Sequence, residues 1–389
     1  AYTYCTDSDS DYGYTNDFTF MTPEQAQQQS ELLAQERFTE GAFEYAVISD
    51  KAVITLCTSQ DTAIDVPDTL GGYPVSTIYP AAFSGLPATV INLPDSVTTI
   101  REMAFYNCAY LQSITLPAGT ESVGNNAFDT CTSLETVDLG GAKTIGQSVF
   151  YGCTSLKSVT ISGECTEISV NGDGDTPFMD ASALEEIIVT EGSGNYCTEN
   201  GVLYNKDKTT LYAYPSAKKD KEFTLPSTVK EIAQSAFYHA VNLEKVDISG
   251  VETIGTYAFE ECSALKSVKT TNTITSLGVD AFFNCTSLRS LRFGDKLTTI
   301  GSYAYGFYYN EDADTENDEQ AETLVEGFKL YCDKDSTAYK FAKNYGIETV
   351  TGTVELFGKN VDKTFLWVMA GILLAAIAAV IGIITGRSI

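Results

Sequence analysis

The stretch "NCTSLRSLRFGDKLTTIGSYAY" (284–305) contains most of a phrase that recurs along the chain. The phrase reads roughly A-F-x-x-C-x-x-L-x-x-V-x-L, and an I-G pair often leads into the next A-F. A single copy cannot bury its own apolar positions, whereas a stack of copies buries them between neighbours. Apart from one gap of 87 residues, the A-F pairs or their equivalents recur every 22 or 23 residues, ending at Phe83, Phe105, Phe128, Phe150, Phe237, Phe259, Phe282 and Tyr305.

Each copy contains a short run that ends in alternating apolar and polar residues, such as "LQSITL" (111–116) or "LEKVDI" (243–248). This period of two is that of a β-strand buried on one face. A period near 22 fits a leucine-rich repeat, in which each turn adds a parallel strand about 4.8 Å from its neighbour. We therefore predict a β-rich α/β fold: a leucine-rich repeat solenoid with a parallel strand ladder over residues 43–350.

The wording of these copies resembles the BspA-type leucine-rich repeats of bacterial and protist surface proteins. Residues 284–305 read like a consensus unit, and "LYCDKDSTAYKFAKNYGIE" (330–348) looks like a closing segment. "NGVLYNKDKTTLYAYP" (200–215) looks like the β-hairpin insertion of such proteins, which we place at about 190–225. The acidic stretch "EDADTENDEQAE" (311–322) departs from the pattern and weakens the register of the last unit.

The N-terminal flank has two predicted parts. Residues 1–21, rich in Tyr, Thr, Asp and Ser, form an extended N-terminal arm. Residues 22–42 form a capping helix, because Thr22 suits the N-cap, Pro23 suits the first helical position and Gln25 completes a capping box. Such a helix would cover the open end of the solenoid, which otherwise exposes its core.

The C-terminal flank contains a long apolar run. Residues 364–386 carry no charged side chain over 23 positions, with Lys363 and Arg387 on either side. This length spans about 30 Å of hydrocarbon as a single transmembrane helix that contacts the lipid bilayer. A buried core helix is the alternative, disfavoured by the length of the run. Residues 351–363 then form a linker, and residues 387–389 a cytoplasmic tail.

Composition limits the partners and the location. The net charge of −28 over 389 residues argues against nucleic acid and anionic lipid surfaces, because long-range repulsion opposes them. The chain starts at Ala1 without a Met, so we expect a mature form from which a signal peptide has been removed. Together these features predict a single-pass protein of the cell membrane whose repeats lie outside the cell.

Half of the ten cysteines occupy one slot of the repeat: Cys108, Cys131, Cys153, Cys262 and Cys285. Ala181 and Ala240 occupy the same slot in other turns, which favours a small buried side chain over a disulfide. The remaining cysteines fall outside the slot, and a bridge among them stays open: Cys5, Cys57, Cys165, Cys197 and Cys332.

The chain shows no arrangement that predicts catalysis. Its one histidine, His239, lies in a repeat bend, where we expect a solvated or capping side chain. We predict neither an enzyme nor a cofactor or metal site. Calcium is a lesser alternative at two acidic stretches, "DSDSDYG" (7–13) and "NGDGD" (171–175), where carboxylate or amide oxygens alternate, although solvated loops explain both.

The outward positions of the strand ladder form the predicted binding surface, because the strand face of a solenoid is usually its extended docking surface. Three of them are basic and three acidic, so this face is near neutral on a strongly acidic chain. A simple preference of Ser and Thr for strands is the alternative. The positions are Ser113, Thr115, Thr136, Asp138, Ser158, Thr160, Glu186, Ile188, Lys245, Asp247, Ser267, Lys269, Ser290 and Arg292.

The family resemblance implies a function that composition alone does not. It implies a membrane-anchored cell-surface protein that binds a protein or a glycan, adhesion-like and non-catalytic. The alternative is a structural or accessory subunit of a membrane-bound surface assembly, in which the repeats and the span meet fixed partners.

Overall fold

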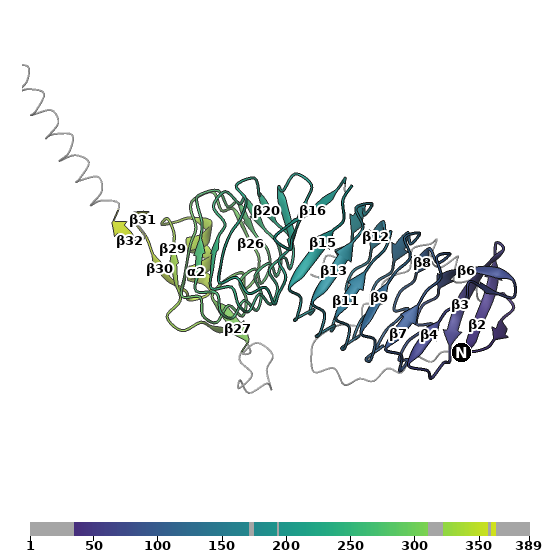
Figure 1. Cartoon of the computed structure of the whole chain (residues 1–389). Coiled ribbons are helices and arrows are strands. Elements are labelled where there is room, and N and C mark those ends of the chain that lie inside the picture. Colours follow the sequence, from purple (N-terminus) through teal and green to yellow (C-terminus); the bar gives the residue numbers. More distant parts are fainter. Residues whose placement is uncertain (1–34, 171–174, 193, 310–321, 357–358, 363–389) are drawn as a thin grey trace, which may run out of the picture.

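The structure, a computed structural model, describes residues 35–170, 175–192, 194–309, 322–356 and 359–362. Within these ranges, short strands follow one another turn by turn and build an elongated solenoid (Figure 1). Four predicted segments lie outside the described residues: the arm 1–21, the larger part of the capping helix 22–42, the membrane span 364–386 and the tail 387–389.

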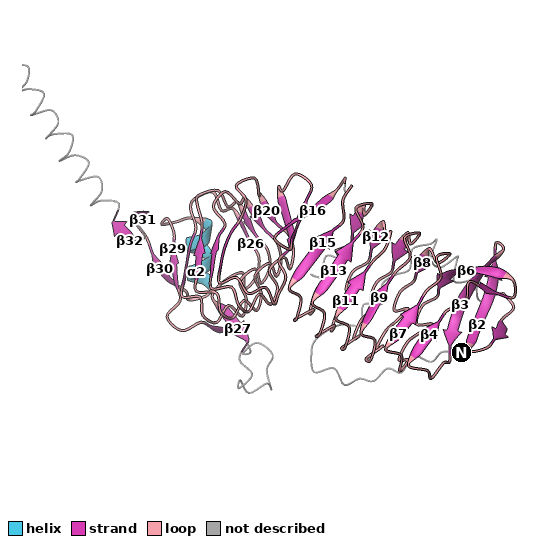
Figure 2. Ribbon diagram, viewed as in Figure 1, coloured by secondary structure: helices cyan, strands magenta, loops and turns pink. Residues whose placement is uncertain are grey.

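One side of the solenoid is the strand face, made of parallel strands that Figure 2 shows side by side. The first ladder has the order β15-β13-β11-β9-β7-β4. Its strands are β4 (Ala63–Asp65), β7 (Val90–Asn92), β9 (Ser113–Thr115), β11 (Thr136–Asp138), β13 (Ser158–Ile161) and β15 (Glu186–Val189).

The strand face continues after the 87-residue gap. The strands β19, β21 and β23 pair in parallel, as do β25, β29 and β30, and β25 lies beside β23. We call these six strands the second ladder: β19 (Glu222–Thr224), β21 (Lys245–Asp247), β23 (Ser267–Lys269), β25 (Ser290–Arg292), β29 (Lys329–Tyr331) and β30 (Glu348–Val350). The parallel solenoid expected from the repeat is therefore confirmed.

A second row of parallel strands, all of two residues except the six-residue β6, runs along the other side of each half. It comprises β6 (Tyr73–Ile78), β8 (Thr99–Ile100), β10 (Ser122–Val123), β12 (Thr144–Ile145) and β14 (Glu167–Ile168), then β20 (Glu231–Ile232), β22 (Thr253–Ile254), β24 (Ser276–Leu277) and β26 (Thr299–Ile300). The I-G pairs follow from this packing. A Cβ at Gly146 or Gly255 would lie 2.6 Å from a backbone nitrogen of the preceding turn, so only glycine fits.

The core is a column of aromatic rings, one from each A-F pair. Phe105, Phe128 and Phe150 are fully buried, with successive ring centroids 5.1 Å and 5.9 Å apart. Phe237 and Phe259 continue the column in the second half at 4.6 Å. Stacked rings of this kind stabilise a fold beyond the area that they bury.

An antiparallel meander separates two hydrophobic cores. It consists of β16 (Tyr196–Glu199), β17 (Val202–Asn205) and β18 (Thr210–Ala213), within the stretch where the sequence predicted a hairpin insertion. Leu203 packs into the first core, whereas its neighbours Val202 and Tyr204 pack into the second. Because strand side chains alternate between faces, β17 acts as a wall between the two halves.

The described N-terminal end corrects part of the capping-helix prediction. Residues 35–42 of the range 22–42 are not helical: β1 (Phe38–Glu40) pairs antiparallel with β2 (Phe43–Ile48). Gly41 adopts a φ of +59° in the intervening turn, and the Phe38 ring lies 5.6 Å from that of Tyr45. The strands β3 (Lys51–Cys57) and β5 (Thr69–Leu70) complete this end by pairing with β2 and β6.

The C-terminal end is closed by the helix α2 (Thr337–Asn344), which lies between β29 and β30 in the chain. Ala338 and Ala342 are fully buried, and the Phe341 ring lies 5.0 Å from that of Tyr305, the last aromatic of the repeats. Before the helix, the antiparallel strands β27 (Phe307–Tyr309) and β28 (Glu322–Leu324) flank residues 310–321, which lie outside the description.

The predicted linker 351–363 contains regular structure. The strands β31 (Thr353–Leu356) and β32 (Lys359–Asp362) pair antiparallel over four residue pairs. Val354 and Leu356 alternate with polar residues, and a Gly lies between the two runs; the linker interpretation overlooked these hairpin signals.

Candidate partner-binding face

The fourteen predicted face residues all lie on strands of the two ladders. In each turn the central residue is buried, as Ile114 and Val137 are, and the residues on either side of it point outward. The parallel register aligns these outward residues in two rows along the solenoid. Ser113, Thr136 and Ser158 are direct neighbours in the first row, and Thr115, Asp138 and Thr160 are direct neighbours in the second.

The first ladder presents mostly hydroxyl groups. Glu186 extends its first row and Ile188, 39% exposed, extends its second. The rows also continue onto β7 and β4, which the sequence analysis did not include. There the Asn92 side chain donates a hydrogen bond to an Asp65 carboxylate oxygen at 2.7 Å. Few charged groups therefore stand on the strands of this half.

The second ladder presents ion pairs that join neighbouring turns. Lys245 donates to Glu222 at 2.6 Å, which raises the pKa of Lys245, and Lys269 donates to Asp247 at 2.7 Å. Burial acts to raise the pKa of Asp247, but hydrogen bonds from Lys269 and Ser249 outweigh it and hold the pKa below its usual value.

The remaining predicted residues of this half complete the rows. Ser267 is the neighbour of Lys245 in the first row, and Ser290 is the neighbour of Lys329 on β29. In the second row, the guanidinium of Arg292 lies over the Tyr331 ring, 4.9 Å from its centroid. The cation–π contact links β25 to β29, so this basic residue also joins two neighbouring strands.

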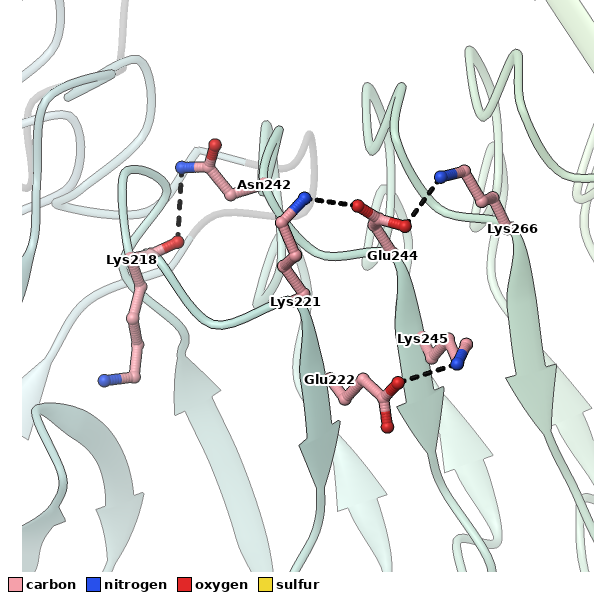
Figure 3. Close-up of polar contacts among 7 residues, drawn as sticks. All are labelled: Lys218, Lys221, Glu222, Asn242, Glu244, Lys245 and Lys266. Carbon is pink, nitrogen blue, oxygen red and sulfur yellow. Dashed lines mark hydrogen bonds and ion pairs between the residues drawn. The ribbon is translucent and has the colours of Figure 1, made fainter.

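A third row precedes the strands, and the sequence analysis missed it. Figure 3 shows Glu244, just before β21, accepting hydrogen bonds from Lys221 of the turn before and from Lys266 of the turn after. These lysine contacts lower the pKa of Glu244 to about 2. The spacing of its members by 23 and 22 residues is a signal of this row in the sequence. The sequence analysis missed it because the alternation of apolar and polar residues begins only with the strands.

The three rows together carry opposite net charge in the two halves. The first ladder has five acids and one base in them: Asp65, Glu135, Asp138, Glu185, Glu186 and Lys157. The turns of β19, β21, β23 and β25 have three acids and six bases: Glu222, Glu244, Asp247, Lys221, Lys245, Lys266, Lys269, Arg289 and Arg292. The near neutrality expected for the face was therefore an average over an acidic and a basic half.

The single histidine lies in the repeat bend between Phe237 and β21. His239 Nδ1 lies 2.9 Å from a Glu261 oxygen, a contact that raises the pKa of the imidazole. The described part of the chain shows no group of three His, Cys, Asp or Glu side chains that could hold a metal ion. Of the two acidic stretches considered for calcium, 7–13 lies outside the described residues, as does 171–174.

The cysteine slot is a packing position. Cys131 and Cys153 are fully buried, and their thiols donate to the Phe105 and Phe128 carbonyls at 3.2 Å and 3.0 Å. All nine described cysteines are free, including Cys57, Cys165, Cys197 and Cys332; Cys5 lies outside the described ranges. The preference for packing over bridging is thus confirmed for the five slot cysteines.

The repeat geometry agrees with a known family profile. The profile of the BspA type leucine rich repeat region matches six copies over residues 76–195 and 208–311. The chain belongs to this family. BspA-type proteins are typically surface proteins, and leucine-rich repeat proteins are generally non-catalytic binding scaffolds. No curated protein matches the chain.

Two solved structures illustrate the likeness of this BspA-type chain. The pneumococcal vaccine antigen PcpA is 20% identical, with 82% of this chain and 99% of that chain covered at a TM-score of 0.59. A leucine-rich repeat protein from Eubacterium ventriosum is 26% identical, with 82% and 85% covered at a TM-score of 0.52.

No helix among the described residues is long and apolar enough to cross a membrane.

Proposed function

We propose that this chain is a non-catalytic cell-surface protein that binds a protein or glycan partner on its strand face. The observation that carries the proposal is the pair of parallel ladders, whose outward rows are free of any core role. Ser113, Thr115 and Thr136 are exposed, while the buried residues between them form the core. Family membership supports the same role, because BspA-type proteins are typically surface proteins.

We further propose that residues 364–386 anchor the protein in a membrane with the repeats outside the cell. The support is the sequence alone, 23 residues without a charged side chain. After alkaline extraction of cells that make the full chain, the protein is expected in the membrane pellet. A variant with Leu373→Arg and Ile377→Arg is expected in the supernatant, and retention of both in the pellet would contradict the anchor.

Crosslinking on intact cells tests the binding face. Ser113→Arg and Thr136→Arg place long side chains on the first row without touching the core, so they are expected to abolish the crosslinked partner band. Asp95→Arg, an equally exposed position in the loop after β7, is the control and should retain the band. Equal loss in all three variants, or in none, would contradict the assignment.

Purification in mild detergent tests the alternative role. An adhesion-like protein is expected to purify alone, because its partner belongs to another surface. A partner that co-purifies at fixed stoichiometry would instead favour an accessory subunit of a surface assembly.

A further inference from the structure

We propose that the second half of the strand face binds an anionic polysaccharide. We call this surface the cationic face; its basic residues are Lys221, Lys245, Lys266, Lys269, Arg289 and Arg292. The inference rests on the proposed function and names the class of ligand for one half of the same face.

The first argument is the distribution of charge along the chain. Residues 35–195 contain 21 acidic and 5 basic residues, a net charge of −16, whereas residues 196–309 contain 12 of each. Within the second stretch, the turns of β19 to β25 carry six bases and three acids on the face, a net charge of +3. A surface of positive charge on a chain of −28 confines a polyanion to this half by attraction here and repulsion elsewhere.

The second argument is which groups a ligand would meet first. The side chains of Lys221, Lys266 and Lys269 are 73%, 59% and 63% exposed, whereas their acceptors Glu244 and Asp247 are only 24% and 23% exposed. The carboxylates of Glu244 and Asp247 therefore lie beneath the ammonium groups, whereas Glu222, 68% exposed, lies at the surface beside Lys245. The ammonium groups of Lys221 and Lys266, each of which donates to Glu244, can also donate to a second anion, because a lysine has three donors.

The first half of the solenoid provides an internal comparison. Lys157, just before β13 of the first ladder, and Lys143, just before β12 of the second row of short strands, also pair with acids of the preceding turn. There the acids are as exposed as the lysines. The exposed fractions are 47% for Lys143 against 63% for Glu121, and 54% for Lys157 against 56% for Glu135. A ligand approaching these pairs meets both signs of charge, so the same type of ion pair does not create a cationic surface there.

The third argument is geometric. Lys245, Lys269 and Arg292 stand on the successive strands β21, β23 and β25, and neighbouring strands of a sheet lie about 4.8 Å apart. Lys269 and Arg292 stand in the second row and Lys245 stands in the first, so their charges form a staggered band along the solenoid axis. Same-side residues of an extended peptide recur about every 6.7 Å, so an acidic strand would drift out of step with the spacing of the strands in this band.

The chemistry of the rows argues against a protein or nucleic-acid partner on this half. Protein interfaces are built around apolar or aromatic anchors, and single-stranded nucleic acids stack their bases on aromatic rings. The outward positions of β19 to β25 offer neither, and the Tyr331 ring on the neighbouring strand β29 is already covered by Arg292. The positions are Glu222, Thr224, Lys245, Asp247, Ser267, Lys269, Ser290 and Arg292.

Dextran sulfate and uncharged dextran test the proposal on the full 389-residue chain in mild detergent. We expect dextran sulfate to bind with an affinity that falls steeply with salt, and dextran not to bind, because the interaction releases counterions. The triple variant Lys221→Gln, Lys266→Gln and Lys269→Gln should weaken binding by about tenfold or more and flatten the salt dependence. The control, Lys143→Gln with Lys157→Gln, should stay within about twofold, and circular dichroism should show every variant folded.

Three results would overturn the proposal. One is equal binding of dextran and dextran sulfate, and another is equal loss in the control and the triple variant. The third is displacement of dextran sulfate by poly-glutamate or single-stranded DNA at equal charge concentration, which would assign the face to an acidic protein or a nucleic acid. None of these touches the crosslinking test, so the first-row variants still decide whether the strand face binds a partner at all.

Discussion

At the scale of the residue, the repeat requires a backbone conformation that most of its residues disfavour. The positions two before and two after the aromatic residue of each A-F pair adopt positive φ. Examples in one pair of turns are Met103 at 55°, Asn107 at 56°, Asn126 at 55° and Thr130 at 56°. This left-handed conformation costs a residue other than glycine roughly 1–2 kcal/mol, and asparagine tolerates it best.

Met103 allows this strain to be tested. Its side chain is 42% exposed, and the equivalent position one turn later is already Asn126. Met103→Asn is expected to raise the free energy of unfolding by about 0.5 kcal/mol, and Met103→Ile to lower it by about 1 kcal/mol, because a β-branched side chain fits a positive φ worst. Urea denaturation of both variants measures this. An isoleucine variant as stable as the asparagine variant would contradict the argument.

Glu260 predicts how stability depends on pH. Burial, helped by the nearby charges of Asp280 and Glu261, raises the pKa of Glu260 from 4.5 to about 8. The folded state therefore holds a proton that the unfolded state releases, so this contribution to stability falls as pH rises from about 4.5 to about 8. Glu260→Gln should melt at a higher temperature than the natural chain at pH ~8.5 and at about the same temperature at pH ~4. The same difference in melting temperature between Glu260→Gln and the natural chain at both pH values would refute this.

The residue scale was also where sequence reasoning worked best. The cysteine slot was recognisable because alanine replaces cysteine at Ala181 and Ala240, and a shared slot in a solenoid is a shared environment. The partner of His239 was not recognisable. Glu261 is 22 residues away, and only the stacking of two bends brings the two side chains together.

At the scale of the element, the strands followed from alternation and the ends did not. Each buried Ile or Val lies between polar residues, so β9 and β11 could be located almost residue by residue. The helix prediction was wrong for residues 35–42 because the helix signals lie earlier in the chain. The Gly41 turn and the aromatic pair of Phe38 and Tyr45 favour a hairpin instead. Local propensity is a weak guide where a tertiary partner is available.

The closing helix α2 makes a prediction at this scale. Ser336 is its N-cap, and its side-chain oxygen accepts a hydrogen bond from the Tyr339 backbone N–H at 3.2 Å. Ser336→Ala should cost about 1 kcal/mol, and Ser336→Asp should cost little because it keeps an acceptor at the cap. Amide exchange is the measurement, with faster exchange expected in α2 and the adjoining β30. An unchanged exchange rate in the alanine variant would show that packing alone holds the helix.

At the scale of the whole molecule, two properties could not be predicted from the sequence of one repeat. Both concern the division of the solenoid into halves. The charge of the strand face changes sign across the insertion, which a count over all turns averages away. The apolar residues of β17 are visible in the sequence. That Leu203 packs into one core and Tyr204 into the other depends on which turns lie on each side of the strand. Such facts belong to the assembled stack and not to any repeat.

The seam between the halves leads to the last prediction. A small cavity lies there, lined by Phe178, Tyr214 and Ser235 among others, and the buried Tyr214 hydroxyl has no hydrogen-bond partner among the described residues. Contacts in a solenoid are mainly between neighbouring turns, so a poorly packed junction should interrupt the cooperativity of unfolding. The two halves are therefore expected to unfold as separate units.

Matched substitutions on the two sides of the seam can reveal these units. Phe128→Ala and Phe259→Ala each remove a fully buried ring from one core, at a cost of about 3–5 kcal/mol. Phe128→Ala should speed amide exchange at Val137 and leave Val246 protected, and Phe259→Ala should do the reverse. Because both variants lose the same ring from the same repeat position, any difference in where exchange rises reports the boundary alone. Exchange that rises along the whole solenoid in both variants would mean that β17 transmits folding between the cores and does not divide them.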